Sequence, residues 1–311
     1  MSPTFSTHSS FSELIDKYDG FILDQFGVLH NGSHGLEGAP ELVAKLSEKG
    51  KRLIILSNSS SASEATKAKL PKLGFNPDHF IGAVTSGQEA GHHVSENFAG
   101  KKALFLTWKT PKTPSPMDFI HLCGDIEVTD RPGEADFVLL HGVDVLRGPG
   151  PDGEAKEQSL GSYFVDASFN VIDRILEECL ENKLPMICAN PDYIMVKPDG
   201  TIGHMPGKIA EKYERMGGSC KSFGKPFVPH FEACLRDLGL PSDRVVHVGD
   251  SLHHDVAGAN GTGIASVFVT GGVHREELGA PLNVLPSERE LEDCFQKHKQ
   301  TPTHVVPMFR E

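Results

Sequence analysis

Short apolar segments that alternate with helix-like segments constrain the fold of this chain more than any other feature. The runs GFILD, RLIILS and HFIGAVT, which begin at Gly20, Arg52 and His79, are each followed by a stretch with helical periodicity. RVVHVGD and ASVFVTGG continue the pattern near the C-terminus. Apolar residues fill these runs without alternating with polar ones, which is typical of strands buried on both faces. We therefore predict an α/β protein with a doubly wound parallel sheet.

The length and the middle of the chain indicate a second folding unit. A chain of 311 residues is long for one simple domain. The segments KALFLT, ADFVLLHG and PMICA predict further strands, so we expect a second α/β unit inserted into the first. We place the core at residues 1–96 and 221–311 and the inserted unit at 97–220. The stretch RGPGPDGEAKEQSLGSY (147–163) contains several glycines and prolines and no hydrophobic period, which predicts a mobile surface loop.

The composition argues against several classes of protein. The net charge of −12, without a basic patch, disfavours a nucleic-acid binder. No apolar run suggests a membrane helix, and the N-terminal residues lack the basic start and apolar core of a secretory signal. The six cysteines are scattered without zinc-type spacing, which favours a reducing, cytoplasmic setting. The pairs His92–His93 and His253–His254 are better explained as solvated or capping residues than as metal ligands, because adjacent side chains on a helix diverge.

Polar side chains stand at the C-terminal ends of the predicted core strands. Asp24, Ser57 and Asp250 each end a strand, Asp255 follows five residues after Asp250, and Lys225 precedes a helix. If the strands are parallel neighbours, these side chains gather at one edge of the sheet. Several carboxylates in one place repel each other unless a hard cation such as Mg²⁺ neutralises them. A hydroxyl, a lysine and loop N–H groups would then hold a phosphoryl group.

Each of these residues has a simpler explanation when it is taken singly. An acid after a strand is usually a turn former or a helix cap, a serine there caps the following helix, and a lone lysine is a solvated charge. Turn chemistry alone does not readily produce several polar residues at strand ends in a compatible order. The combination therefore favours the functional interpretation.

The order of four motifs resembles a known family. DQFGVLHNG, LSNSS, GKP and GDSLHHD resemble the four motifs of the haloacid dehalogenase (HAD) superfamily. The wider segments GVLHNGSHGLEGAPELVAKLSEKG, TSGQEA, ANPDY and VTGG resemble its class IIA, the NagD-type and p-nitrophenylphosphatase-like branch, over roughly residues 18–279. The resemblance implies a Rossmann-like core with an inserted α/β cap of the C2 type. It also implies a phosphatase that acts on a small phosphorylated metabolite, with Mg²⁺ as cofactor and a homodimer formed through the cap.

The resemblance also assigns roles to residues of the core. Asp24 matches the nucleophile that forms an aspartyl-phosphate, which water later hydrolyses. Ser57 matches the hydroxyl that binds the transferring phosphoryl group, with Asn58 nearby. Lys225 matches the lysine that steadies the nucleophile and the phosphoryl oxygens. Asp250 and Asp255 match the acids of the Mg²⁺ site.

A loop of the inserted unit is expected to contact the leaving group. In the family such a cap loop reaches the substrate, and here that role falls to the region of Asn190, Pro191 and Asp192. Tyr193 or His204 would assist. The sequence does not choose among sugar, nucleotide and cofactor phosphates.

The sequence departs from the family pattern two residues after the nucleophile. The phosphatases of the family carry aspartate there, and this chain carries Phe26. The backbone carbonyl of Phe26 can still ligate Mg²⁺. Its side chain cannot protonate a leaving oxygen or activate water, and such general acid–base help is typically worth about 10²–10⁴-fold in rate. We therefore expect a slow phosphatase or one restricted to good leaving groups.

Two alternatives stay open beside this enzyme. One is a catalytically weak protein that binds or senses a phosphorylated metabolite, which Phe26 favours. The other is phosphotransfer or phosphonate cleavage at the same site. An enzyme is favoured over a pure binder, because a binder need not keep a nucleophile and this chain retains the full set of Asp24, Ser57, Lys225, Asp250 and Asp255. A dinucleotide-dependent oxidoreductase is disfavoured, because no GxGxxG motif follows the first strand.

Overall fold

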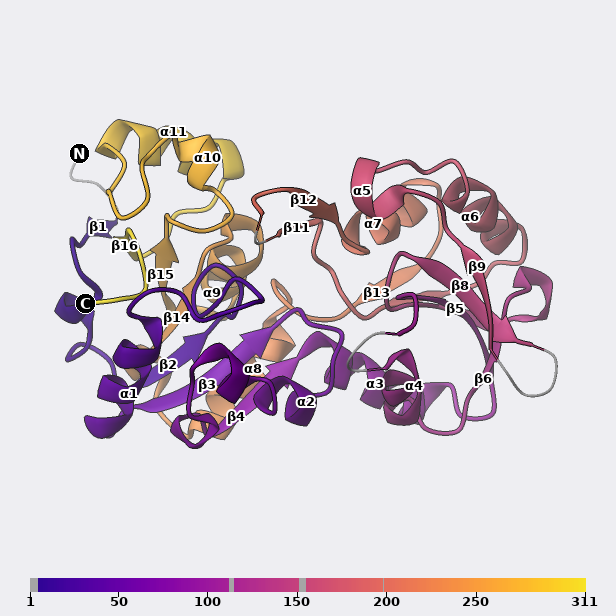
Figure 1. Cartoon of the computed structure of the whole chain (residues 1–311), viewed down its shortest axis with the longest axis horizontal. Helices are drawn as coiled ribbons and strands as arrows, with labels where there is room; N and C mark the ends of the chain where they lie inside the picture. Colours follow the sequence, from indigo (N-terminus) through magenta and orange to yellow (C-terminus); the bar gives the residue numbers. More distant parts are fainter. Residues whose placement is uncertain (1–4, 112–114, 151–154, 198) are drawn as a thin grey trace. The chain divides into compact units, whose positions relative to one another are not determined.

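The chain forms two compact units in the computed structural model, which describes residues 5–111, 115–150, 155–197 and 199–311 (Figure 1). The first unit comprises the described residues up to Ser57, together with Thr66–Val84 and Lys225–Glu311. The second comprises Asn58–Ala65 and the described residues of Thr85–Gly224. Helix α3 (Ser86–Asn97) lies in the second unit, whereas our boundaries assigned nearly all of it to the core. Those boundaries stay a prediction.

The first unit is built on one sheet of seven strands in the order β1, β16, β15, β14, β2, β3, β4. Pairing is parallel from β1 through to β3, which confirms the predicted parallel sheet. The strands are β1 (Ser6–Thr7), β2 (Gly20–Leu23), β3 (Arg52–Ser57), β4 (Gly82–Thr85), β14 (Val245–Gly249), β15 (Ala265–Val269) and β16 (His304–Val306).

Helices cover both faces of this sheet, as the unalternating apolar strands predict. Helix α1 (Ala39–Glu48) buries Leu42 and Leu46 in a cluster that includes Phe21 and Leu23 of β2. Between those two residues, Ile22 belongs to a different cluster, formed with α8 (Val228–Leu238) and α9 (Ala257–Thr262). Successive side chains of β2 thus enter opposite cores, which makes the sheet doubly wound.

Two further helices pack against strands β15 and β16. Helices α10 (Arg275–Leu278) and α11 (Glu288–His298), yellow in Figure 1, share a buried cluster with both strands. The π-helical turn η7 (Leu252–Val256) joins the same cluster. The remaining helical elements are η1 (Phe11–Leu14), α2 (Ser63–Lys67), which spans the boundary between the units, η2 (Leu70–Leu73), η3 (Pro77–His79) and η6 (Ser242–Arg244).

The second unit has a mixed sheet with helices on both faces. Its strand order is β13, β10, β7, β5, β8, β9, with β6 beside β5. One cluster contains residues of α6 and α7, and another contains residues of α3 and α4. The strands are β5 (Lys102–Thr107), β6 (Glu127–Thr129), β7 (Phe137–Leu140), β8 (Val145–Pro149), β9 (Ala155–Ser159), β10 (Met186–Cys188) and β13 (Cys220–Ser222). The helical elements are α4 (Pro116–Leu122), η4 (Pro132–Glu134), α5 (Tyr163–Asp166), α6 (Ile172–Glu181) and α7 (Gly207–Arg215), and β11 (Ile194–Val196) pairs with β12 (Ile202–His204) in a separate antiparallel ribbon.

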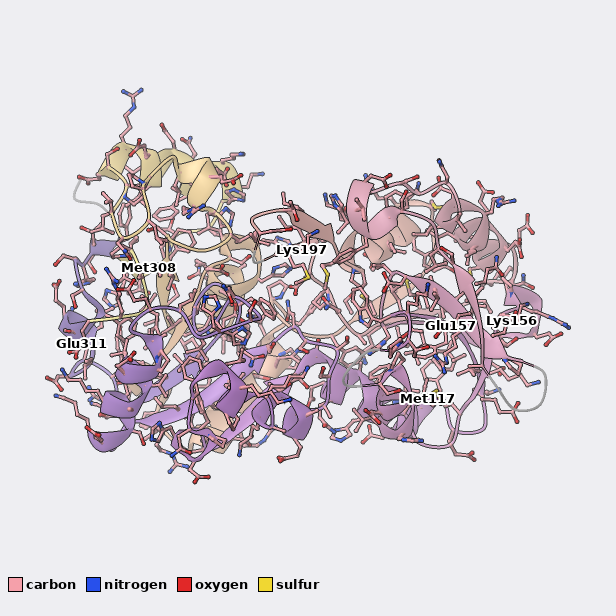
Figure 2. All side chains as sticks on the ribbon, in the orientation of Figure 1. Met117, Lys156, Glu157, Lys197, Met308 and Glu311 are labelled. Carbon is pink, nitrogen blue, oxygen red and sulfur yellow. The ribbon has the colours of Figure 1, made fainter. Side chains whose placement is uncertain are left out.

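Our prediction of a mobile surface loop over residues 147–163 is wrong for most of this stretch. Strands β8 and β9 form an antiparallel pair, and residues 151–154 lie outside the described part of the chain. Val145 and Leu146 are buried and anchor β8. Strand β9 is an exposed edge strand, so it carries polar residues such as Lys156 and Glu157 (Figure 2) and shows no hydrophobic period. The Arg147 Nη1–Glu157 Oε1 ion pair, at 2.7 Å, joins the two strands.

No helix among the described residues combines the length and the apolar character that crossing a membrane requires.

Candidate active site

The strand register brings the predicted site residues of the first unit to one edge of its sheet. Strand β2 pairs with β14 so that Leu23 is opposite Val248, and the N–H of Asp24 donates to the Val248 carbonyl at 2.9 Å. On the other side, β2 pairs with β3 so that Leu23 is opposite Ile55. Asp24 therefore leaves the sheet between the ends of the strands that carry Asp250 and Ser57. Ser57 is buried at the last position of β3.

A buried lysine joins two of the carboxylates. Lys225 Nζ lies 2.5 Å from Asp24 Oδ1 and 2.8 Å from Asp255 Oδ1. All three residues are less than a tenth exposed, and Lys225 stands just before α8. Burial alone would favour the neutral amine, but the two carboxylates outweigh it and hold the pKa of Lys225 above its ordinary value. The lysine is therefore a fixed positive charge at this edge.

Asp255 is held by donors on several sides. Besides Lys225, His247 Nε2 lies 2.8 Å from Asp255 Oδ1, and the N–H of Ser251 donates to Oδ2 at 2.9 Å. Burial acts to raise the pKa of Asp255, but Lys225 and His247 together hold it below the ordinary range. Asp255 is thus an ionised anchor for the lysine.

Asp250 lies between two glycines. The N–H of Val273 donates to Asp250 Oδ2 at 2.8 Å. A Cβ at Gly27, where φ is +78°, would stand 1.9 Å from this oxygen, and one at Gly272 would stand 2.1 Å from it. Only glycine at both positions lets the backbone approach the carboxylate so closely. The loops that carry these glycines therefore close around Asp250.

The electrostatics of the edge suit a hard divalent cation. Asp24, Asp250 and Asp255 each offer one oxygen, and the three atoms lie within 4.8 Å of one another. Burial, with a contribution from Asp255, raises the pKa of Asp24 to about 7 despite Lys225, and burial with the charge of Asp24 raises that of Asp250. One lysine thus leaves three close carboxylates undercompensated. A cation with a preference for oxygen ligands, such as Mg²⁺, fits this donor set.

Phe26 lies on the tight turn that follows β2. The Gln25 carbonyl accepts from the N–H groups of Leu29 and His30, and the Phe26 and His30 rings meet edge to face with centroids 4.7 Å apart. The side chain of Phe26 is 41% exposed, so it does not belong to the core. His30 is buried, and burial lowers its pKa to about 4, which keeps the ring neutral near pH 7. This turn therefore presents an apolar ring where the family carries an acid.

The second unit brings together its three predicted substrate-binding residues. Asn58 Nδ2 donates to Asp192 Oδ1 at 2.7 Å, and the N–H of Asp192 donates to Asn190 Oδ1 at 3.0 Å. Ser86 Oγ donates to the carbonyls of Ser59 and Ala189, which ties the segment of Asn58 to that of Asn190. Two amides and a carboxylate therefore form a polar group in this unit, and their role in substrate binding stays a prediction.

Tyr193 and His204 flank the ribbon of β11 and β12. Tyr193 precedes β11, and the N–H of Met205 donates to its carbonyl at 3.0 Å. His204 ends β12 opposite Ile194. Burial lowers the pKa of His204, so its ring is neutral near pH 7. The expected help of either residue in contacting the leaving group stays a prediction.

Sequence reasoning missed His247. It is fully buried on β14 and contacts Asp255 directly. The available signal is a single histidine inside the apolar strand RVVHVG, eight residues before the acid that it touches. Among the described residues, the histidine pairs that we set aside, His92–His93 and His253–His254, are not part of the two groups of potential metal donors.

Comparison with known proteins places the chain in a family. Residues 21–113 match the model of haloacid dehalogenase-like hydrolases, and residues 222–311 match a second model described as HAD-hydrolase-like. Together the two models span more than half of the chain. The chain belongs to the haloacid dehalogenase-like hydrolases. It is a class IIA member, as its motifs predict.

Relatives of this HAD hydrolase align over nearly the whole chain. Glycerol-3-phosphate phosphatase of Mus musculus is 27% identical, covering 94% of this chain and 89% of the relative. A 4-nitrophenylphosphatase of Schizosaccharomyces pombe is 24% identical, covering 89% and 92%. A haloacid dehalogenase-like hydrolase from Brucella suis has the same fold, with a TM-score of 0.71 at 22% identity over 96% and 97% of the two chains. The predicted enzyme class, a hydrolase of the HAD phosphatase type, is confirmed at this level.

Proposed function

We propose that this HAD hydrolase is a Mg²⁺-dependent phosphatase that cleaves a small phosphate monoester through an aspartyl-phosphate on Asp24. The observation that carries the proposal is the buried Asp24–Lys225–Asp255 ion-pair chain beside Asp250 at one edge of the sheet. Structural ion pairs are rarely buried together with a surplus of carboxylates, because the uncompensated charge is unfavourable. A site built to receive a cation and a phosphoryl group accounts for this surplus.

The metal would be held by Asp24, Asp250 and the backbone carbonyl of Phe26. Bound Mg²⁺ would offset the negative charge of the carboxylates and of the phosphoryl oxygens. Both oxygens of Asp255 already accept hydrogen bonds, one from Ser251 and the other from the Lys225–His247 side. We assign to Asp255 mainly the positioning of Lys225, and only through its remaining lone pairs a contribution to the metal site.

The chain's own residues would carry the two chemical steps. An ionised Asp24 oxygen forms a bond to phosphorus while the bond from phosphorus to the leaving oxygen breaks, and the leaving group departs with the electron pair. Water then attacks phosphorus, releases inorganic phosphate and regenerates Asp24. Lys225 keeps one Asp24 oxygen in place, and the hydroxyl of Ser57 with the adjacent N–H groups would bind the phosphoryl oxygens.

Phe26 limits which substrates suit this chemistry. The phenyl side chain can neither protonate the leaving oxygen nor take a proton from water. We therefore propose a preference for leaving groups that are stable as anions, or that take a proton from the substrate itself or from a residue of the second unit. The relatives named for glycerol 3-phosphate and 4-nitrophenyl phosphate support a small phosphate monoester as the substrate class.

The polar group of the second unit is our candidate for recognition of the leaving group. Asn58, Asn190 and Asp192 present amide donors and a carboxylate acceptor, which suit hydroxyl groups of a small polar metabolite. A cytoplasmic location and a homodimer formed through this unit stay predictions.

A phosphometabolite-binding protein is the second candidate. The exposed Phe26 ring favours it, because an apolar side chain beside Asp24 slows both chemical steps while leaving the cation and phosphate contacts in place. Such a protein would bind inorganic phosphate and Mg²⁺ without turning over an activated ester.

The test is hydrolysis of p-nitrophenyl phosphate with and without Mg²⁺. Its leaving group needs little protonation, so the assay asks whether nucleophile and metal work without the missing acid. We expect Mg²⁺-dependent turnover that falls by on the order of 10⁴-fold or more in Asp24→Asn, as removal of a hydrolase nucleophile does. Asp78→Asn, an exposed acid of the same unit outside the cluster, should retain full activity. Unchanged turnover in Asp24→Asn would refute the mechanism, and absent turnover with phosphate binding intact would favour the binding protein.

A further inference from the structure

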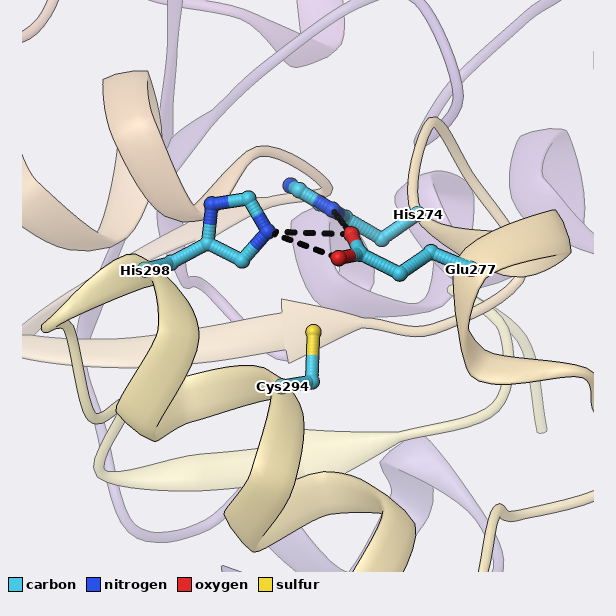
Figure 3. Close-up of side chains that lie close together, drawn as sticks. All are labelled: His274, Glu277, Cys294 and His298. Atoms are coloured by element: carbon cyan, nitrogen blue, oxygen red, sulfur yellow. Dashed lines mark hydrogen bonds and ion pairs between the residues drawn. The ribbon is translucent and has the colours of Figure 1, made fainter.

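Four potential metal donors converge in the first unit, outside the acidic site. His274 directly precedes α10, Glu277 lies on α10, and Cys294 and His298 lie one turn apart on α11 (Figure 3). One donor atom from each side chain lies within 4.8 Å of the other three. The spacings are His-x-x-Glu and Cys-x-x-x-His, which place each pair on one side of its segment. Two short stretches of chain therefore supply two donors each.

The contacts between these side chains centre on Glu277. His274 Nδ1 lies 2.8 Å from Glu277 Oε2, and His298 Nε2 lies 3.0 Å from the same oxygen and 3.1 Å from Oε1. The Cys294 thiol is buried and points toward the carboxylate in Figure 3. Lys297 also pairs with Glu277 Oε1. Without a metal, the Glu277 carboxylate thus pairs with both imidazoles and with Lys297.

We propose that His274, Glu277, Cys294 and His298 form a Zn²⁺ site, separate from the Mg²⁺ site proposed for catalysis. Two imidazoles, a thiolate and a carboxylate are the ligand types that zinc takes in four-coordinate protein sites. Magnesium binds oxygen ligands and avoids thiolate, so this donor set selects against it. The mixed nitrogen, sulfur and oxygen set is what distinguishes the cluster from the carboxylates around Asp24.

The dimensions of the cluster fit a tetrahedral zinc ion after a small adjustment. Zinc–nitrogen bonds of about 2.0 Å and zinc–sulfur bonds of about 2.3 Å place neighbouring donors about 3.3–3.6 Å apart. The His–Glu contacts, at 2.8–3.1 Å, are slightly shorter than this, and the widest separation, up to 4.8 Å, is longer. Rotations of side chains at the ends of two helical segments can supply both changes.

The charges of the cluster also balance with Zn²⁺. A thiolate and a carboxylate neutralise the two positive charges of the ion, and Lys297 keeps its pairing with the outer oxygen of Glu277. Zinc binding displaces the thiol proton of Cys294 and the protons that His274 and His298 direct at Glu277. The thiol proton goes to solvent, and each imidazole proton moves to the other ring nitrogen or to solvent.

The four ligands differ in the contacts that they lose when zinc binds. The N–H of Leu252 donates to His274 Nε2 at 3.2 Å, which directs the ring proton of His274 to Nδ1. Binding zinc through Nδ1 therefore breaks the Leu252 hydrogen bond, whereas Glu277, Cys294 and His298 lose contacts only within the cluster. We expect His274 to be the weakest contributor of the four.

The decisive experiment titrates Co²⁺ into chelator-treated, full-length protein and follows its absorption spectrum. Co²⁺ in this site would give a thiolate-to-cobalt charge-transfer band in the near ultraviolet and strong tetrahedral bands in the visible. Co²⁺ held by the carboxylates around Asp24 gives no thiolate band, so the spectrum separates the two sites. Zn²⁺ should abolish the bands, and excess Mg²⁺ should leave them unchanged.

Variants then identify the ligands. Cys294→Ser should abolish the charge-transfer band, and His298→Gln should weaken Zn²⁺ binding by more than about 100-fold, beyond the 10–100-fold that loss of an outer partner produces. His274→Gln should weaken it by only about 10-fold. Matched controls are Cys179→Ser, another buried thiol, and Asp250→Asn, which removes a carboxylate of the other site; both should keep the band.

Either part of the experiment can overturn the proposal. A wild-type titration without a thiolate band would do so whether or not any variant folds. A band that persists in Cys294→Ser, or that disappears equally in Cys179→Ser, would assign the cobalt to another thiol. Circular dichroism of each variant shows whether the loss of the band reflects the ligand or the fold.

Discussion

The acidic cluster (Asp24, Asp250 and Asp255) and the mixed cluster (His274, Glu277, Cys294 and His298) differ in their donor atoms and in their exposure to solvent. Around Asp24 the donors are carboxylates, all nearly buried, and a buried lysine runs between two of them. Around Glu277 the donors are imidazoles, a thiol and one carboxylate, and the side chains of Glu277 and His298 are each 26% exposed. The first set suits Mg²⁺ and the second suits Zn²⁺. Under our two proposals, two sites of one unit take different metals because their ligand atoms differ.

The pKa values express the same contrast. Burial raises the pKa of Asp24 to about 7, because one lysine does not offset the surrounding carboxylates. Burial also acts to raise the pKa of Glu277, but Lys297, His274 and His298 outweigh it and lower the pKa to about 2. In the acidic cluster around Asp24, the single positive charge of Lys225 does not balance the carboxylates. In the mixed cluster around Glu277, three cationic or hydrogen-bonding side chains surround one carboxylate. Only the first needs a cation to ionise fully near pH 7.

Restoring an acid to the acidic cluster should have the largest effect. In Phe26→Asp the new carboxylate would protonate the leaving oxygen and then activate water, so hydrolysis of alkyl phosphates should rise by up to about 10²-fold. Aryl phosphates should gain less, because their leaving groups depart readily as anions. Phe26→Asn, which has a similar size but no acid, is the control. Equal gains on both substrate types would show that the added group acts in some other way.

In metal-free protein, the ionisation of Asp24 and that of Glu277 should give the stability opposite dependences on pH. Asp24 has a raised pKa, so the native state binds the extra proton, and its contribution is lost as pH rises from about 4 through about 7. Glu277 has a lowered pKa, so its contribution is present above about pH 4.5 and is lost as pH falls through about 2. Between about pH 5 and pH 8, the free energy of unfolding of the wild type should fall by on the order of 2 kcal/mol relative to that of Asp24→Asn.

Urea unfolding with a chelator measures this difference. The matched comparison is Glu277→Gln, whose stability relative to wild type should stay constant over the same interval. If the difference in free energy of unfolding between wild type and Asp24→Asn did not grow with pH, Lys225 alone would offset the charge of the carboxylates. The contrast between the two clusters would then be lost.

Crossed substitutions should separate the two metals, with a smaller effect. Asp250→Asn should raise the Mg²⁺ concentration for half-maximal hydrolysis of p-nitrophenyl phosphate by about 10-fold or more, because it removes a ligand oxygen. Cys294→Ser should shift this concentration far less, although it abolishes the thiolate–cobalt band. If both variants changed the Mg²⁺ requirement equally, the clusters would act as one site.

The acidic cluster could be predicted from the sequence because local patterns determine it. Each apolar strand ends on a polar residue, and parallel pairing then places those ends together, so Asp24, Ser57 and Asp250 needed no further information. Their family roles still rest on resemblance. His247 was missed because a histidine in an apolar strand gives no sign of the partner that it meets.

The mixed cluster could not be predicted in the same way. The spacings within His274–Glu277 and Cys294–His298 are visible in the sequence, but each is common on helical surfaces. Their convergence depends on how α10 and α11 pack beside β15 and β16, which is tertiary information. Strand β9 was missed for a related reason. An exposed edge strand is specified by its partner strand rather than by its own apolar pattern.

Pre-steady-state hydrolysis of p-nitrophenyl phosphate, with mass analysis of the quenched protein, tests the central claim most directly. Because Phe26 cannot activate water, the second step should be slow and the aspartyl-phosphate should accumulate. The account predicts a burst of nitrophenolate equal to the enzyme concentration, with one phosphoryl group on Asp24 and neither signal in Asp24→Asn. Linear release without a phosphorylated Asp24, together with turnover that survives Asp24→Asn, would contradict it.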